Sequence, residues 1–251
     1  METGGITEYI DVAQVTLYAF WIFFAGLIFY LRREDRREGY PLEDAPGVMR
    51  DPGAIWMPAP KVFRTPQGDR VAPRAETDAD RPLAAEPIAA WHGAPLEPTG
   101  DPMADGVGPA AYALRQDVPD MTFDGKPKIV PMRVAAEFAI VSRDPDPRGM
   151  PVIGCDGNTG GTVTDVWVDR GEAMIRYLEL DVAGRKVLMP MPLAKVGKDS
   201  VKAKSLKGSN FTGVPAHANP DQVTRLEEDK ICAYWGSGHL YATEDRKDPL
   251  L

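Results

Sequence analysis

An uninterrupted apolar stretch near the N-terminus, residues 12–31, places the strongest constraint on what this chain can fold into. The stretch reads VAQVTLYAFWIFFAGLIFYL, contains no charged residue and ends at Arg32-Arg33. Twenty helical residues rise about 30 Å, which matches the hydrocarbon core of a bilayer. A lone segment in lipid satisfies its backbone hydrogen bonds only as a helix. The sequence therefore predicts one transmembrane helix over residues 12–31.

The charges on either side of this stretch predict its orientation. Residues 1–11 carry three acidic residues and no Lys or Arg, whereas RREDRRE follows the stretch. Because basic residues beside a span stay in the cytoplasm, we expect a periplasmic N-terminus at 1–11 and a cytoplasmic remainder. A cleaved signal peptide is the alternative. It requires a basic start, a shorter apolar run and a small-residue cleavage site, which this sequence lacks.

The overall composition argues against several classes of function. The chain has 29 basic and 37 acidic residues, a net charge of −8, which disfavours a nucleic-acid partner. Cys155 and Cys232 are far apart, so in a reducing cytoplasm we expect small buried residues and no disulfide. The three histidines are scattered and give no metal-ligand spacing. The sequence contains none of the common nucleotide-binding or hydrolase motifs, which indicates a non-enzymatic protein.

A proline-rich segment follows the apolar stretch. Between Pro41 and Pro109 the chain holds 13 of its 24 prolines, a density that excludes long helices and central strands. A disordered linker is one interpretation. Aromatic residues such as Trp56 and Trp91 are interleaved, however, and a solvated tether has little use for them. We therefore expect residues 32–107 to form an extended, mostly irregular segment that lies along the surface of a partner.

From residue 108 onward the pattern changes to that of a mainly-β domain, 108–251. Alternating apolar residues predict two longer strands, a hairpin turn at Ala183-Gly184 and several short strands. Their number and spacing favour a small antiparallel barrel or sandwich. The strands are expected over residues 160–169, 173–182, 185–190, 193–196 and 200–205.

One short helix is expected near the C-terminus, at about 220–235. Asn219 is a good N-cap and Pro220 suits the first helical position. The helix should end before Gly236, and its acidic cluster at 227–229 would be a solvated face. The residues after Tyr241 have the composition of a loose tail.

Several long strings resemble one family, the H subunit of the photosynthetic reaction centre of purple bacteria. The strings span nearly the whole chain in order: FWIFFAGLIFYL, REGYPLE, TGDPMADGVGPA, GCD, VTDVWVD and LEEDKICAYW. The resemblance implies a single transmembrane helix in the bacterial inner, intracytoplasmic membrane and a cytoplasmic antiparallel barrel of the PRC type. It also implies a cap over the cytoplasmic face of the L and M subunits, which stabilises the complex and its quinone sites.

The resemblance further implies that this subunit binds no cofactor itself. The bacteriochlorophylls, bacteriopheophytins, quinones and non-haem iron belong to L and M. Light-harvesting antenna subunits, a cytochrome subunit and lipids are further candidate partners. The implied role is to conduct protons from the cytoplasm to the secondary quinone. A membrane-anchored PRC-barrel adaptor for another complex is the alternative, and a tethered hydrolase would need a nucleophile–base pair that we do not find.

The resemblance also names candidate proton-transfer residues. The motif VDRGEAMIRYLE matches the family's carboxylate cluster and places Glu172 and Asp169 in it, with Arg176 tuning the charges. Without the resemblance, these would be exposed carboxylates at a hairpin turn. At the uptake end, the family often has histidines where this chain reads DMTFDGKP. Uptake is then expected at Asp124 or Asp120, or elsewhere, and a divalent-metal site at the histidine positions should be missing or weakened.

Overall fold

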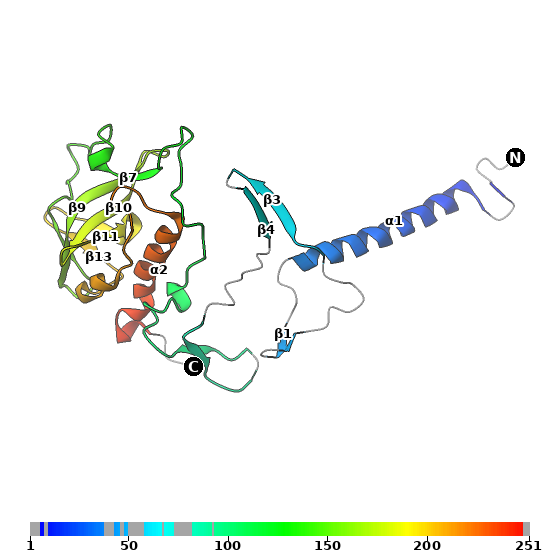
Figure 1. Cartoon of the computed structure of the whole chain (residues 1–251). Helices are drawn as coiled ribbons and strands as arrows, with labels where there is room; N and C mark the ends of the chain where they lie inside the picture. Colours follow the sequence, from blue (N-terminus) through cyan, green and yellow to red (C-terminus); the bar gives the residue numbers. More distant parts are fainter. Residues whose placement is uncertain are drawn as a thin grey trace. The chain divides into compact units, whose positions relative to one another are not determined.

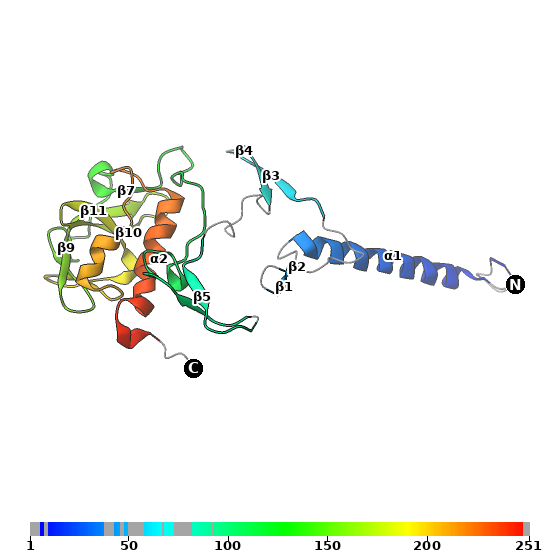
Figure 2. The same cartoon turned by 60° about the horizontal axis from the view of Figure 1, so that its bottom comes forward.

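The computed structural model describes residues 6–7, 10–37, 43–45, 48–49, 58–66, 68–72, 82–91 and 93–247. The chain divides into two compact units, which are described separately. One lies within residues 1–81 and 90–93, and the other within 82–89 and 94–251. Figures 1 and 2 show the elements of both units from two directions. The boundary expected at 107–108 remains a prediction.

The first unit contains the predicted membrane helix. Helix α1 spans Val12–Glu34 and is followed by a 3₁₀ turn, η1, at Asp35–Arg37. Asp11 caps its N-terminus, because the Asp11 carboxylate accepts a hydrogen bond of 2.7 Å from the backbone N–H of Gln14. No residue of α1 is buried within the chain. Among the described residues it is the one helix long and apolar enough to cross a membrane.

Short isolated hairpins occupy the described parts of the proline-rich segment. They pair β1 (Glu43–Ala45) with β2 (Val48–Met49), β3 (Lys61–Thr65) with β4 (Gly68–Ala72), and β5 (Ala85–Pro87) with β6 (Leu96–Pro98). The prediction that this segment lacks long helices and central strands agrees with them, but the hairpins themselves were not predicted. Trp56 and most of REGYPLE lie outside the described residues.

The second unit is built around one long strand, β9 (Thr159–Asp169). Strand β10 (Met174–Val182) pairs along one edge of β9, and β11 (Arg185–Pro190) pairs with β10. The other edge of β9 is shared by β8 (Pro151–Ile153) and β7 (Ile129–Pro131). The sheet continues from β8 to β13 (Val201–Ala203) and β12 (Ala194–Val196). Strands β9 to β13 confirm the five predicted strands, whereas β7 and β8 were not predicted.

Turn chemistry explains the β10–β11 hairpin. Ala183 and Gly184 both have positive φ, 52° and 84°, which is the conformation of a two-residue type I′ turn. One feature of the expected antiparallel barrel is wrong, because β8 and β13 run parallel. In addition, no pairing joins β11 to β12 among the described strands, so the sheet does not close by hydrogen bonds. The mainly-β architecture itself is confirmed.

Helix α2, Arg225–Tyr241, packs against edge strand β11. Figure 2 shows the helix running alongside the sheet. Trp235 is fully buried, its ring contacts Phe211 at a centroid distance of 5.0 Å, and its indole N–H donates a 2.9 Å hydrogen bond to the carbonyl of Leu188. The helix thereby covers the sheet edge. The remaining 3₁₀ turns are η3 (Gly108–Ala110), η4 (Met132–Val134), η5 (Met191–Leu193), η6 (Gly208–Gly213) and η7 (Glu244–Arg246).

The predicted limits of this helix were wrong at both ends. Thr224, not Asn219, is the N-cap, because its side chain and that of Glu227 form a reciprocal capping box. The helix also continues through Gly236 and Gly238. A Cβ atom at Gly238 would lie 2.4 Å from a methyl carbon of Leu206. The close packing of Gly238 against Leu206 thus compensates for the poor helix propensity of glycine.

Two smaller expectations also need correction. The residues after Tyr241 are not a loose tail as far as Lys247, because the guanidinium of Arg246 donates to the carbonyls of Ser205 and Gly238, each at 2.7 Å. The cysteines are not buried: Cys155 is partly exposed and Cys232 is exposed, and both are unbridged thiols. The small size of a cysteine side chain did not predict burial here, because Cys232 lies in a cleft that opens to solvent.

Candidate functional site

A polar cleft of about 300 Å³ lies where three parts of the second unit meet. Its walls come from the segment before β7, from the adjacent ends of β9 and β10, and from α2. Ionisable side chains dominate its lining, which consists of Arg115, Asp120, Lys128, Ile129, Asp169, Arg176, Tyr177, Arg225, Glu228, Asp229 and Cys232. Such a concentration of titratable groups in a cleft is typical of a functional site.

The loop that carries Asp120 is fastened to the start of α2. Pro119 and Thr224 form an isolated antiparallel bridge, and the backbone N–H of Arg225 donates to the carbonyl of Val118. The Arg225 guanidinium then lies 2.7 Å from the Asp120 carboxylate. The hydrogen bond from Arg225 holds the pKa of Asp120 below its usual value. The capping box of α2 therefore also positions this ion pair.

One face of α2 supplies the acidic wall of the cleft. Glu228 and Cys232 are four residues apart, so both side chains lie on the same side of the helix. Asp229 forms an ion pair with Arg115 at 3.2 Å and accepts a 2.9 Å hydrogen bond from the backbone N–H of Ala113. The prediction of a solvated acidic face is wrong here, because residues 227–229 are all partly buried and two of them, Glu228 and Asp229, line the cleft.

The surroundings of Glu228 in this cleft favour its protonated form. Burial raises its pKa, while the hydrogen bond from Tyr177 and the charge of Arg176 oppose the rise without cancelling it. The buried hydroxyl of Tyr177 donates to Oε2 of Glu228 at 2.6 Å and lies 3.7 Å from Sγ of Cys232. Burial also raises the pKa of Tyr177 far above its usual value, so this hydroxyl remains a donor.

The opposite wall contains a lysine shared by two of the predicted acids. Nζ of Lys128 lies 3.4 Å from Asp169 and 3.3 Å from Glu172. Hydrogen bonding to Glu172 is the main factor that raises the pKa of Lys128, so the ammonium group stays charged at neutral pH. Asp169 is almost completely buried, whereas the Glu172 side chain is 54% exposed. Lys128 thus links a buried carboxylate to one that faces solvent.

The turn between β9 and β10 explains this arrangement. Oδ1 of Asp169 accepts hydrogen bonds from the backbone N–H groups of Gly171 and Glu172, at 2.8 and 3.0 Å. Asp169 therefore fixes the turn as well as lining the cleft. The sequence alone favoured an exposed turn carboxylate; the turn is correct, but the exposure is wrong for Asp169, which is buried and also lines the cleft.

The structure separates the five predicted residues into two groups. Asp120, Asp169 and Arg176 line the cleft, and Glu172 joins them through Lys128. Asp124 lies apart in a small loop closed by the Met121–Pro127 bridge. Its carboxylate accepts a 2.6 Å hydrogen bond from the hydroxyl of Thr122 and forms a 3.0 Å ion pair with Lys126. The Thr122 hydrogen bond contributes most to lowering the pKa of Asp124 to about 2.

Sequence reasoning missed the contribution of α2 to the site. The spacing of Arg225, Glu228, Asp229 and Cys232, at steps of three, four and seven, marks one side of a helix and was a usable signal. Tyr177 and Lys128 gave no such signal. They belong to a strand and to an irregular segment, and only the fold brings them to the same cleft.

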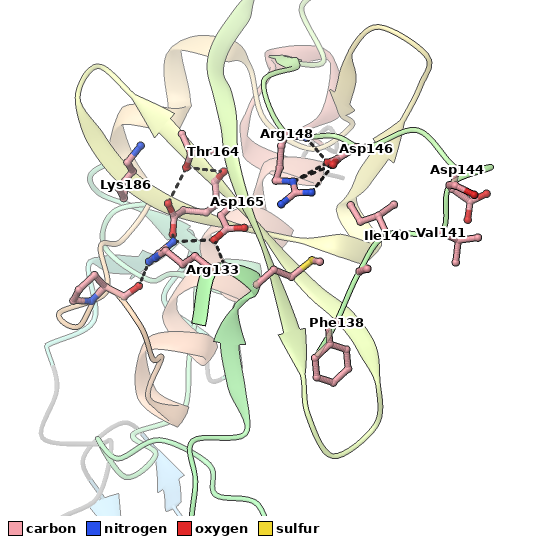
Figure 3. Close-up of a pocket in the computed structure, with 15 residues that line it drawn as sticks. Arg133, Phe138, Ile140, Val141, Asp144, Asp146, Arg148, Thr164, Asp165 and Lys186 are labelled. Carbon is pink, nitrogen blue, oxygen red and sulfur yellow. Dashed lines mark hydrogen bonds and ion pairs between the residues drawn. The ribbon is translucent and has the colours of Figure 1, made fainter. Parts of the chain in front are cut away.

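A second and larger cavity, of about 900 Å³, lies elsewhere in the same unit (Figure 3). Figure 3 shows Arg133 pointing toward Asp165 beneath Thr164, while Arg148 and Asp146 face each other farther along the wall. Nη1 of Arg133 lies 2.8 Å from Glu179 and 3.2 Å from Asp165. Both carboxylates belong to strands of the sheet and are more than nine-tenths buried.

The buried charges of this second cavity are already satisfied by the protein. Glu179 accepts hydrogen bonds from Thr164 at 2.8 Å and from the indole N–H of Trp167 at 3.0 Å, in addition to Arg133. Burial raises the pKa of Glu179, but these three donors together outweigh it and leave the pKa below the usual value. When the donors and acceptors of a buried network pair with one another, the network rigidifies the core and helps to specify its arrangement. We therefore assign this cluster a structural role.

No group of three or more His, Cys, Asp and Glu side chains in the described part of the chain has the geometry to hold a metal ion.

Comparison with known families gives two matches. Residues 4–134 match the photosynthetic reaction centre H-chain N-terminal region, and residues 139–210 match the PRC-barrel domain. The first match covers more than half of the chain. The second covers β8 to β13 and the start of η6.

Proposed function

Since this chain belongs to the H-chain family of photosynthetic reaction centres, we propose that it conducts protons through the polar cleft toward the secondary quinone of the assembled complex. The family is that of a structural subunit associated with the L and M subunits, and α1 indicates anchoring in the membrane. In the proposed arrangement the second unit lies on the cytoplasmic side and stabilises the quinone sites. The cofactors of the complex reside in L and M.

The observation that carries this proposal is the grouping of five acidic or phenolic side chains around one cleft. Asp120 comes from the segment before β7, Asp169 and Tyr177 come from the sheet, and Glu228 and Asp229 come from α2. Reduction of a quinone to a quinol consumes protons that must cross protein from the aqueous phase. A conduit needs titratable groups within a hydrogen bond, or one water, of each other. The 2.6 Å hydrogen bond between Tyr177 and Glu228 is one such contact, whereas the ion pairs of Asp120 with Arg225 and of Asp169 with Lys128 hold carboxylates of the cleft in place.

The proton affinity of one group in the cleft, Glu228, also supports the proposal. Ordinary carboxyl groups titrate near pH 4 and hold few protons at neutral pH. Burial raises the pKa of Glu228, which makes it the candidate for a group that is transiently protonated. Lys128 and Arg225 place positive charge beside the other acids. A cluster of this kind takes up and releases protons collectively.

The proposal is tested with Glu172→Gln in the assembled reaction centre. Glu172 is the most solvent-facing member of the Lys128 group, and the amide keeps its size while removing its proton-binding group. We expect the second, proton-coupled electron transfer to the secondary quinone to slow by about tenfold or more, as for loss of a group in general acid–base chemistry. The first electron transfer should not change. Both rates are measured by flash-induced absorbance changes across pH.

Glu244→Gln is the matched control, because the Glu244 side chain is 88% exposed and pairs with Lys247 outside the cleft. It should leave both rates unchanged. An unchanged second electron transfer in Glu172→Gln would remove Glu172 from the path.

Isolation in mild detergent tests the assembly itself. If the chain purifies without near-infrared pigment absorption, the PRC-barrel adaptor becomes the better hypothesis.

A further inference from the structure

The β3–β4 hairpin of the first unit exposes apolar side chains on both of its faces. Val62, Phe63 and Val71 are 58%, 51% and 45% exposed. Val62 faces Val71 across the strands, and Phe63 faces Arg70. Because neighbouring residues of a strand point to opposite faces, the described residues of this unit cover neither side of the hairpin. A two-stranded hairpin alone is marginally stable in water, so this one requires an external surface.

Contacts with α1 fix the depth at which the hairpin begins. Glu34, the last residue of α1, forms a bidentate ion pair with Arg37 at 2.6 and 3.1 Å. The third guanidinium nitrogen of Arg37, Nη1, donates to the carbonyl of Ala59, and Lys61 at the start of β3 approaches Glu34 to 3.8 Å. Since residues 12–31 match the hydrocarbon core, Glu34 and the base of the hairpin lie at the level of the lipid headgroups.

The charge of this region is opposite to that of the whole protein. Residues 32–37 and 61–72 contain seven basic and three acidic side chains, whereas the chain carries a net charge of −8. The basic residues are Arg32, Arg33, Arg36, Arg37, Lys61, Arg64 and Arg70. Basic residues interleaved with exposed apolar side chains are the composition of a surface that binds at a membrane interface.

We propose that the β3–β4 hairpin is a docking surface for anionic phospholipid headgroups. Arg64 and Arg70 would contact the phosphates, and Val62, Phe63 and Val71 would enter the boundary between headgroups and acyl chains. A neighbouring protein is the less suitable occupant. Cytoplasmic loops of membrane proteins are themselves rich in Lys and Arg, so a basic hairpin is repelled by them and attracted by anionic lipid.

Hydrogen exchange of the full-length chain in nanodiscs tests this proposal, without L or M subunits. The discs contain phosphatidylcholine alone, or phosphatidylcholine mixed with phosphatidylglycerol, and exchange over residues 60–72 is followed by mass spectrometry. We expect the backbone amides of β3 and β4 to exchange about tenfold more slowly in the anionic discs. At about 1 M salt, where the Debye length falls to about 3 Å, the difference should shrink.

Charge-removing and charge-keeping variants separate lipid binding from a loss of folding. Arg64→Gln with Arg70→Gln should abolish the difference between the two kinds of disc, because each basic residue strengthens attraction to an anionic surface about fivefold. Arg64→Lys with Arg70→Lys should retain it. The matched control, Lys195→Gln with Lys202→Gln, removes two charges that face each other across β12 and β13 in the other unit. It should also retain the difference.

Two outcomes would overturn the proposal. Equal exchange in neutral and anionic discs would show that headgroup charge does not matter. Protection that develops only after L and M are added would assign the hairpin to the reaction-centre core instead. Neither result bears on the proton-conduction proposal, which concerns the cleft in the second unit.

Discussion

The hydroxyl group of Tyr177 donates a 2.6 Å hydrogen bond to Oε2 of Glu228, and this contact joins the central sheet to α2. Tyr177 lies in β10 and is 2% exposed. Glu228 lies one turn into α2, on the face that lines the cleft. A buried phenol with a strongly raised pKa always presents a proton to this carboxyl group. The pair should therefore affect both the stability of the fold and the way that stability depends on pH.

Glu228→Gln should change how stability depends on pH. Because burial raises the pKa of Glu228, the folded chain binds more protons than the unfolded chain between about pH 4.5 and the folded pKa. The free energy of unfolding of the wild type consequently falls as pH rises through that window. Glutamine is neutral throughout, so the variant should be more stable than the wild type near pH 8 and similar near pH 4. Thermal unfolding in detergent, followed by circular dichroism at both pH values, measures this.

Tyr177→Phe is the complementary change. It removes the donor but keeps the ring, so the variant should lose about 1–2 kcal/mol from the free energy of unfolding at neutral pH. The hydrogen bond from Tyr177 lowers the pKa of Glu228, so its loss should raise that pKa further. The pH window of falling stability would then widen upward. A pH profile identical to that of the wild type would show that the two groups are not coupled.

Arg133→Met should be among the more destabilising substitutions in the second unit. It leaves the carboxylates of Glu179 and Asp165, 5% and 8% exposed, without their cation. Breaking a buried pair costs about 3–5 kcal/mol, and the 39% exposure of Arg133 reduces the expectation to about 2–4 kcal/mol. Arg148→Met, which breaks the exposed pair with Asp146, should cost less than about 1 kcal/mol.

The same network predicts a dependence on acid. The pKa of Glu179 is lowered in the folded chain, so its contribution to stability is present above about pH 4.5 and is lost as pH falls through the folded pKa. The cost of Arg133→Met should therefore be largest at neutral pH. Adding Glu179→Gln to Arg133→Met should recover part of the loss. Additive effects in this double-mutant cycle would contradict a direct coupling.

Local patterns were sufficient to predict much of the fold. The apolar length of α1, the alternation in β9 and β10 and the Ala183-Gly184 turn each specify their structure within a few residues. The parallel pairing of β8 with β13 was not predictable in this way, because Val152 and Val201 are brought together across almost fifty residues of chain. The prediction placed the start of α2 at Asn219 and Pro220, whereas the reciprocal capping box of Thr224 and Glu227 starts the helix five residues later.

The candidate site was predictable only in part, for a related reason. Asp169 and Glu172 share one turn, and a family motif includes both. Their lysine partner, Lys128, approaches because β7 pairs with the end of β9, a contact between distant segments. Glu228 looked like a surface residue of an acidic helix, and only the position of Tyr177 beneath it shows otherwise. When a titratable site is assembled from several elements, the sequence of each element alone gives little indication of it.

Gly238→Val tests whether close packing explains the extension of α2. A Cβ atom at this position would lie 2.4 Å from Leu206 and 2.6 Å from the carbonyl oxygen of Ser205. Overpacking of this kind costs about 1–3 kcal/mol, although valine forms helices better than glycine. Gly236→Ala is the control, because nothing lies within 4 Å of its added Cβ. It should stabilise the helix by about 0.5–1 kcal/mol.

The alternatives for proton uptake, Asp120 and Asp124, differ in where the structure places them. Asp120 lines the cleft and is held by Arg225, whereas Asp124 is exposed, has a pKa of about 2 and is paired with Lys126 outside the cleft. The pKa of both carboxyl groups is lowered, so their positions, inside and outside the cleft, distinguish them as uptake groups. Asp120→Asn should therefore slow the second electron transfer to the quinone by about tenfold, and Asp124→Asn by less than about twofold. Both rates are measured by flash spectroscopy of reaction centres near pH 8. The opposite ranking would place uptake at the Asp124 loop and would show that the cleft is bypassed.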